Sequence, residues 1–316
     1  MNNRMKYKKQ ITTFKNLIDF YGITHGTMMF SLRYLNRKKY YQLIIDDLKK
    51  EFKNYLPSLN KKILDLPLKK ISESSCNVWV LWYQGIENAP KVVQKNIEQL
   101  KRITQNTDFN VVVLNSNNLS KYLQLPAFIL KKVRAGNITL THLSDIIRAG
   151  LLSEKGGIWL DATCYVTENN FNEVSDFLFY SQKYAPNQTE FFNEGKWSGF
   201  FMASGQFNPL ETYLYDMFLK YHETFKNIVD YFLIDILIEL GYQEFDIIKK
   251  LIDDVPYNNS KIMEITDNFN APMSFSKDFR FDDTWIFKLD WRTQISSNNA
   301  TFGIWFYKNV VFKEKE

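Results

Sequence analysis

The chain has 316 residues, 45% of them hydrophobic and 24% charged, which is the composition of a globular protein with one large domain or two small ones. This composition excludes general disorder, and the two cysteines, Cys76 and Cys164, are too few for a framework of several disulfides and suit a reducing compartment. The N-terminus is polar and basic, and no apolar run approaches the roughly 18 residues that span a bilayer, so neither a signal peptide nor a membrane helix is visible and we expect a cytoplasmic protein.

The net charge of +5 is unevenly distributed along the chain. Residues 1–70 hold 16 of the 40 Lys and Arg residues and 5 of the 35 Asp and Glu residues, an excess of 11 positive charges, while the remainder has an excess of 6 negative charges. Between positions 8 and 56 the apolar residues recur every three or four positions, which predicts amphipathic helices.

A basic segment with many aromatic residues suits an anionic membrane surface or a nucleic acid, but it also suits ordinary helices packed on a main domain. We therefore expect a basic helical segment at 1–70, membrane-proximal or packed on the core, and a main domain at 71–316. The sequence contains no helix-turn-helix, RNA-recognition or zinc signature, so we expect no nucleic-acid partner.

The middle of the chain alternates predicted strands and helices. Short apolar runs at 78–82, 111–114 and 158–160 predict buried strands, and helical patterns at 90–103, 126–134 and 142–154 lie between them. Turn-forming residues, Gly156 and Gly157 among them, end these elements. Such an alternation predicts an α/β sandwich with a mostly parallel central sheet, in which ligands bind beyond the carboxyl ends of the strands.

Beyond residue 165 the order of elements is less regular. Helical patterns cover 209–225 and 228–251, and short strands are expected around 199–204, 285–289 and 301–307. The sequence contains no internal repeat and no low-complexity tract, and a second full domain is not evident.

Asp161 lies at one of the predicted strand ends, directly after three apolar residues. A carboxylate there can hold Mg²⁺ or Mn²⁺ against a pyrophosphate leaving group, as the transfer of a sugar from a nucleotide diphosphate requires. An Asp at a strand end is also common as a helix cap or as a hydrogen-bonded loop residue.

The helix before this strand adds a charged pair. Asp145 and Arg148 are three residues apart and so project from one helix face, and Ser144 beside them can cap or donate a hydrogen bond. A surface salt bridge contributing less than about 1 kcal/mol is the alternative. Because the rest of the helix is mostly apolar, we expect the pair to lie in a cleft.

These residues resemble a known family. Leu143 to Arg148 and Leu151 to Thr163, together with Val78 to Gly85 and Leu123 to Pro126, resemble the conserved block of the capsular polysaccharide synthesis glycosyltransferases. That family is related to α-mannosyltransferase-like enzymes with a sugar-binding region containing a DXD motif. The resemblance covers more than half of the chain and weakens after about residue 205. It implies a GT-A-like fold and a retaining transfer.

The resemblance also implies roles for individual residues. Asp145, Arg148 and Asp161 would be catalytic, and the donor would be bound by Trp82, Ser144, Asp145, Arg148, Gly157, Asp161 and Ala162. Trp82 would stack on uracil, although a tryptophan in the strand core is an equal alternative. A metal, Mn²⁺ or Mg²⁺, would be held by Asp161 and Thr163.

Thr163 departs from the motif, because it stands where the second Asp of DXD is expected. A neutral hydroxyl is a weaker metal ligand than a carboxylate. Three alternatives follow: Thr163 coordinates the metal weakly, Asp161 and the pyrophosphate hold the metal, or the enzyme depends less on a cation.

The function implied is the transfer of a hexose, with galactose or glucose favoured, from a UDP-sugar to an undecaprenyl diphosphate-linked saccharide during surface polysaccharide synthesis. The protein would then lie peripherally on the inner face of an anionic cell membrane. The alternatives are a non-catalytic scaffold that binds a nucleotide sugar and a basic nucleic-acid-binding protein.

Overall fold

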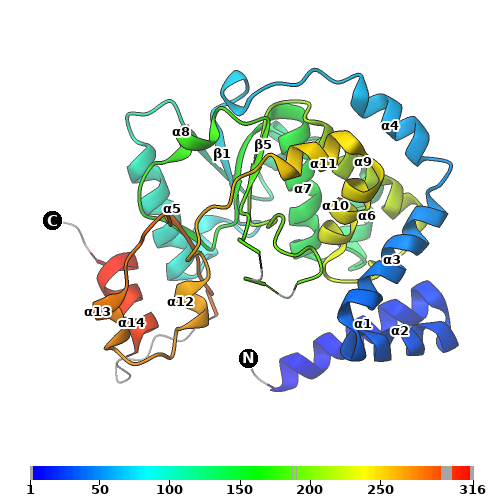
Figure 1. The fold of residues 1–316 in the computed structure, drawn as a ribbon, viewed down its shortest axis with the longest axis horizontal. Helices are drawn as coiled ribbons and strands as arrows, with labels where there is room; N and C mark the ends of the chain where they lie inside the picture. The colour runs from blue at the N-terminus through cyan, green and yellow to red at the C-terminus, as the bar shows by residue number, and fades with distance from the viewer. Residues whose placement is uncertain (1–2, 187, 190, 293–300, 314–316) are drawn as a thin grey trace.

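The computed structural model describes residues 3–186, 188–189, 191–292 and 301–313, with side chains from residue 10 onward. A five-stranded sheet in the order β2-β1-β3-β6-β5 forms the centre of the molecule (Figure 1). Its strands are β1 (Asn77–Leu81), β2 (Asn110–Leu114), β3 (Gly157–Leu160), β5 (Phe179–Ser181) and β6 (Phe201–Ser204).

Most strands of this sheet point the same way. The strand β1 pairs in parallel with β2 and β3, whereas β6 pairs antiparallel with both β3 and β5, so β6 is the reversed strand among those described. All four residues of β3 are buried, because helices cover both faces of the sheet, and a strand in this position has a continuous apolar run instead of an alternating one. The predicted α/β class with a mostly parallel central sheet is confirmed.

Helices cover both faces of the sheet. Figure 1 shows α5 (Lys91–Thr104) on one side and α7 (Leu140–Lys155), α9 (Pro209–Thr224) and α10 (Leu233–Glu244) on the other. Further helices are α6 (Ala127–Arg134), α8 (Phe171–Val174) and α11 (Asp246–Asp253). The expected helix at 228–251 is interrupted at Phe245, whose extended backbone separates α10 from α11.

The helix α7 delivers the chain to β3 through a defined turn. Thr139 caps its N-terminus by accepting a hydrogen bond from the His142 backbone N–H at 3.2 Å, and Gly156 with φ 68° ends it. At Gly157 (φ 102°) a Cβ atom would lie 2.5 Å from the Asn77 carbonyl oxygen, so β1 and β3 can pair only around a glycine.

The N-terminal segment is helical, as predicted. It forms α1 (Asn3–Tyr21), α2 (Ile23–Leu35), α3 (Arg37–Glu51) and α4 (Leu56–Leu64), of which α1 packs on α2, α3 on α10, and α4 on α9. The side chains of Tyr40 and Tyr41 in α3 are fully buried, and the Tyr40 hydroxyl donates to Asp230 at 2.9 Å. The helices α3 and α4 therefore share the main hydrophobic core, and a domain boundary at residue 70 stays a prediction.

A smaller layer lies beside the main sheet, formed by β4 (Cys164–Val166) and β7 (Ile286–Lys288) in antiparallel pairing. Three short helices pack near it, α12 (Glu264–Asp267), α13 (Phe275–Asp278) and α14 (Phe302–Phe306), and η4 (Tyr307–Val311) continues α14 as a π-helix. Single 3₁₀ turns occur at η1 (Ile71–Glu73), η2 (Ile86–Asn88) and η3 (Leu119–Lys121).

The strand expected at 301–307 is wrong, because this run forms α14. The Thr301 side chain caps the helix by accepting from the Ile304 backbone N–H, and the apolar side chains of Phe302 and Phe306 are buried in a second hydrophobic cluster. A short apolar run that is buried on all sides has no periodicity by which strand and helix can be distinguished.

Within the described residues, no helix has both the length and the hydropathy needed to cross a bilayer.

Candidate functional site

A cleft of about 700 Å³ opens at the carboxyl ends of β1 and β3. These two strands are parallel and adjacent, so the residues that follow them, Trp82 and Asp161, reach the same edge of the sheet. The helices α7 and α10 and the end of β7 supply the remaining walls. The volume is in the range of sites that bind small molecules and cofactors.

One guanidinium joins the two predicted carboxylates in this cleft. Arg148 Nη1 lies 3.3 Å from Asp145 Oδ1, and Arg148 Nη2 lies 3.2 Å from Asp161 Oδ1. The exposed fraction is 5% for Arg148 and 8% for Asp145, so this is not a solvated surface pair. The Arg148 guanidinium also lies over the Trp159 ring, 5.2 Å from its centroid. The planar fork of arginine suits such bridging, which a lysine could not reproduce.

The Asp161 carboxylate accepts hydrogen bonds from three side chains. Besides Arg148, the Trp159 Nε1–H donates to Oδ1 at 3.1 Å, and the Lys288 ammonium donates to Oδ2 at 2.6 Å. Burial opposes ionisation of Asp161, but the charges of Lys288 and Arg148 outweigh it and lower the pKa of the carboxyl to about 2. Asp161 is therefore fully ionised at neutral pH.

The structure brings most of the predicted site residues together. Trp82, Ser144, Ala162 and Thr163 line the same cleft as the charged cluster. The Trp82 ring meets Trp291 edge to face at 6.0 Å between centroids, and its buried Nε1–H has no hydrogen-bond partner in the described part of the chain. Trp82 is thus a cleft residue and not a tryptophan enclosed within the sheet.

Gly157 is not brought to the cleft. It begins β3, whereas Asp161 follows the other end of that strand, and its missing Cβ makes room for the carbonyl of Asn77. Its role in this structure is the close approach of two strands, and the expected contact with a donor stays a prediction.

The residues at Asp161 do not fit a divalent cation in this conformation. Both carboxylate oxygens already accept from cationic or N–H donors, and the hydroxyl of Thr163 is the neighbouring group where a second acid was expected. Among the described residues, no three His, Cys, Asp or Glu side chains form a group that could hold a metal ion. The predicted Mn²⁺ or Mg²⁺ therefore stays a prediction, and no step below depends on it.

Lys288 on β7 and Asp235 on α10 are among the cleft residues that sequence reasoning did not assign to the site. The Asp235 carboxylate accepts from Trp197 Nε1–H at 3.0 Å. Burial raises the pKa of Asp235 to about 7, an effect that the Trp197 hydrogen bond opposes and the charge of Asp145 increases. The available signal for both residues was the weak family resemblance that continues at 231–235 and 288–289.

A buried glutamate on α9, Glu211, offers a test of the electrostatics near Arg148. Glu211 is fully buried, and neither carboxyl oxygen has a hydrogen-bond partner among the described residues. Burial raises the pKa of Glu211 to about 8, although the charge of Arg148 opposes the rise. Because the folded pKa exceeds the unfolded value near 4.5, the free energy of unfolding should fall as the pH rises from about 4.5 to about 8.

We expect Glu211→Gln to remove this pH dependence and to be more stable than wild type at pH 8 by roughly 3 to 5 kcal/mol. Urea unfolding at several pH values between 5 and 8 measures the effect, with the exposed Glu223→Gln as the matched control. If the free energy of unfolding changes equally with pH in wild type and Glu211→Gln, the Glu211 carboxyl is ionised or solvated in the folded protein.

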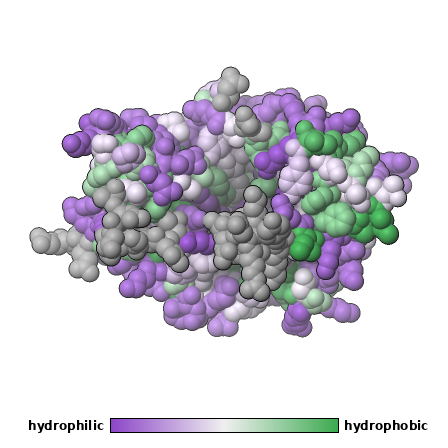
Figure 2. Space-filling model, turned by 90° about the horizontal axis from the view of Figure 1, so that it is seen from below, coloured by the Kyte–Doolittle hydropathy of each residue, from purple (hydrophilic) through white to green (hydrophobic). Residues whose placement is uncertain are grey.

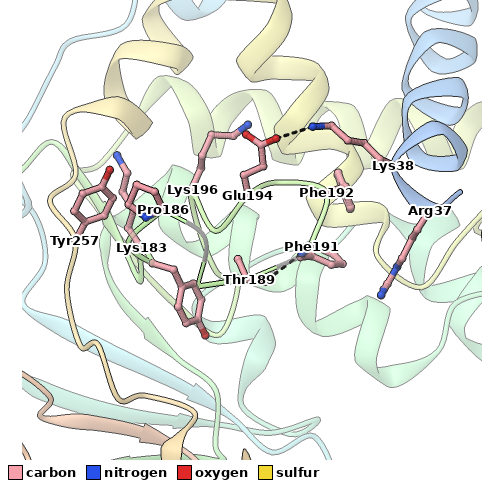
Figure 3. Close-up of a pocket in the computed structure, with 11 residues that line it drawn as sticks. Arg37, Lys38, Lys183, Pro186, Thr189, Phe191, Phe192, Glu194, Lys196 and Tyr257 are labelled. Carbon is pink, nitrogen blue, oxygen red and sulfur yellow. Dashed lines mark hydrogen bonds and ion pairs between the residues drawn. The ribbon is translucent and has the colours of Figure 1, made fainter.

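A second hollow, of about 530 Å³, lies between the start of α3 and the loop that follows β5 (Figure 3). Its charged groups are largely paired within the protein. Lys38 bonds Glu194 at 2.8 Å, Lys196 bonds Glu239 at 3.1 Å, and Lys183 donates to two backbone carbonyls. The Arg37 guanidinium lies over the Phe191 ring. Because its cations already have partners, this hollow is a weaker candidate than the cleft at Asp161.

Comparison with known proteins adds independent information. The model of the family described as "Capsular polysaccharide synthesis protein" matches residues 28–308. The chain is similar to the O-glycosyltransferase PaGT of Phomopsis amygdali, with 28% identity over 117 residues, and to the O-glycosyltransferase braB of Annulohypoxylon truncatum, with 31% identity over 115 residues. Each match covers 34% of this chain and, respectively, 28% and 26% of the relative, so it spans about a quarter of these relatives' length.

The solved structures to which the chain shows a weak likeness are also glycosyltransferases. The galactosyltransferase LgtC, in complex with donor and acceptor sugar analogs, gives 10% identity and a TM-score of 0.40 over 75% of this chain and 95% of its own. The apo form of the glycosyltransferase GlyE of Streptococcus pneumoniae TIGR4 gives 13% identity and a TM-score of 0.41 over 75% and 60%. A likeness at these TM-scores adds nothing about substrates.

Proposed function

Because the chain belongs to the capsular polysaccharide synthesis protein family, we propose that it is a retaining glycosyltransferase that moves a hexose from a UDP-sugar to a lipid-linked saccharide. The observation that carries the proposal is the cluster of Asp145, Arg148 and Asp161 at the sheet edge, in a cleft large enough for a small-molecule ligand. Galactose and glucose are the favoured sugars.

The proposed donor lies along the cleft with its base towards β1 and its sugar towards α7. Trp82 offers an aromatic ring to the base, and Asp145 with Arg148 offers acceptors and donors to the sugar hydroxyls. The bridging guanidinium fixes these groups before the ligand arrives, which lowers the entropy cost of binding.

The first experiment is a screen of nucleotide sugars. Purified protein is incubated with UDP-glucose, UDP-galactose and the corresponding GDP- and dTDP-sugars, and release of the nucleoside diphosphate is measured with and without a lipid diphosphate saccharide. We expect turnover with a UDP-hexose and none for Asp161→Ala. Tight binding of a UDP-sugar without turnover would instead support a scaffold, and equal behaviour of both proteins with every donor would contradict the enzyme.

An enzyme with a lipid-linked acceptor must reach a membrane surface. The helices α1 and α2 carry a surface that could bind a membrane. Large apolar side chains are exposed there, and Figure 2 shows such side chains gathered on the part of the lower face formed by α1 and α2. They are Ile11, Phe14, Ile23, Met28, Tyr34 and Leu35. With the basic excess of residues 1–70 they form a surface suited to the interface of an anionic bilayer, so we propose a peripheral position on the inner membrane face.

We expect the protein to sediment with vesicles of phosphatidylglycerol and phosphatidylcholine, and binding should weaken as salt rises from about 50 to about 500 mM. Replacing the two most exposed apolar residues, Ile23→Ser with Leu35→Ser, should lower the partition coefficient by about tenfold or more. The paired change Leu64→Ser with Leu68→Ser, at exposed sites outside α1 and α2, is the control. Binding that ignores both salt and the α2 changes would refute this surface.

A further inference from the structure

Lys288 places an ammonium group in the cleft beside Asp161. Its ammonium lies 2.6 Å from Asp161 Oδ2, and its side chain is 20% exposed. An ammonium group carries three N–H donors, and in the described part of the chain one of them is directed at Asp161. Donors therefore remain for an anionic ligand that enters the cleft.

The backbone holds this lysine in a fixed place. The antiparallel pairing of β4 with β7 sets Lys288 opposite Cys164, next to the segment that carries Asp161 and Thr163. The Lys288 N–H donates to the Ile262 carbonyl at 2.8 Å, and its carbonyl accepts from the Thr266 hydroxyl at 2.6 Å. These two bonds fix the backbone from which the Lys288 side chain enters the cleft.

The side chains around Asp161 favour this lysine over a metal ion. A divalent ion at Asp161 would have to displace a charge-assisted hydrogen bond, and it would find a threonine hydroxyl where a second carboxylate is needed. It would also lie next to two positive charges, the Lys288 ammonium and the Arg148 guanidinium. Coulomb repulsion between like charges at this separation opposes its binding.

We infer that Lys288 replaces a divalent cation in this protein and that its ammonium neutralises the diphosphate of the nucleotide donor without a metal. The inference rests on the proposed function. Asp161 then acts as a positioning residue that holds Lys288 and Arg148 towards the diphosphate. Lys288 itself contacts the leaving group.

In the transfer, the bond between the sugar C1 and the diphosphate oxygen breaks, and its electron pair stays on that oxygen. The acceptor hydroxyl oxygen forms the new bond to C1, and its proton passes to the leaving diphosphate. The negative charge therefore grows on the diphosphate, where an ammonium that is already in place stabilises it without reorganisation of solvent.

The decisive measurement is calorimetric titration of wild-type protein with UDP, once in EDTA and once in excess Mn²⁺. We expect the dissociation constants to agree within about twofold. Lys288→Met should weaken UDP binding by about 10- to 100-fold in both buffers, which is the effect of losing one hydrogen bond between charged groups. Because UMP lacks the second phosphate, Lys288→Met should weaken UMP binding less than UDP binding. Lys288→Arg should recover most of the affinity for UDP.

The exposed Lys308→Met is the matched control and should bind UDP as wild type does. Loss of wild-type UDP binding in EDTA, restored by Mn²⁺, overturns the inference while leaving the proposed function intact. Unchanged UDP affinity in folded Lys288→Met overturns it as well, because the ion pair with Asp161 would then be only structural. If no nucleoside diphosphate binds in either buffer, the proposed function fails and the inference with it.

Discussion

The variant Asp161→Asn is expected to lower kcat/KM for glycosyl transfer by about 100- to 1000-fold. The asparagine side chain keeps the size of the aspartate but removes the charge that orients both Arg148 and Lys288. Its amide also presents N–H donors where the carboxylate offered only acceptors, so one of the two cations loses its partner. Initial rates with the donor identified by the screen measure the effect.

The control for this variant is Asp176→Asn, since Asp176 is an exposed carboxylate in a surface ion pair with Lys70. Such a pair contributes little to stability, and the change should leave the rate unaffected. A folded Asp161→Asn protein that retains transfer within about twofold of wild type would remove Asp161 from the machinery. The UDP-binding results would then have to be explained by another part of the cleft.

The part of the site that sequence reasoning found is the part that is local in the chain. Asp145 and Arg148 lie on one helix and Asp161 directly follows the next strand, so a single stretch of sequence carried both the expected charged pair and the resemblance that grouped all three. The same reasoning predicted the parallel arrangement of β1, β2 and β3, because alternating apolar runs and helices leave few other topologies.

The part that it missed depends on pairing between distant segments. Lys288 reaches Asp161 only because β7 pairs with β4, and three-residue strands carry too little pattern to fix a register in advance. Asp235 enters the cleft from α10 through the packing of that helix on α3 and α9. The resemblance implied a donor contact for Gly157, whereas its backbone angle and the close Asn77 carbonyl oxygen show a role in strand pairing.

The second large expected effect is the loss of stability when Arg148, which bridges Asp145 and Asp161, is replaced. We expect Arg148→Met to lower the free energy of unfolding by about 3 kcal/mol or more, because it leaves Asp145 buried without its ion-pair partner. Asp161 keeps Lys288, which limits the loss. Urea unfolding at pH 7 measures the change, and Arg102→Met, at an exposed arginine of α5, is the matched control.

The pH dependence gives this variant a distinctive signature. The low pKa of Asp161, about 2, means that its ion pairs stabilise the fold above the unfolded value near 3.8 and are lost as the pH falls towards 2. Without Arg148 the pKa of Asp161 should rise, so acid unfolding should begin at a higher pH. A variant with the wild-type acid transition would show that Lys288 alone holds the carboxylate.

A double-mutant cycle separates the pair from its surroundings. Asp145→Asn combined with Arg148→Met should cost less than the sum of the two single changes, because the second change removes a group that the first has already left unpaired. The expected difference is about 1 kcal/mol or more, since both side chains are nearly buried and the pair is poorly screened by water. If the stability losses of the two single variants add up to that of the double variant, Arg148 stabilises the fold through Asp161 and not through Asp145. The sugar-binding role proposed for Asp145 would then need a partner other than Arg148.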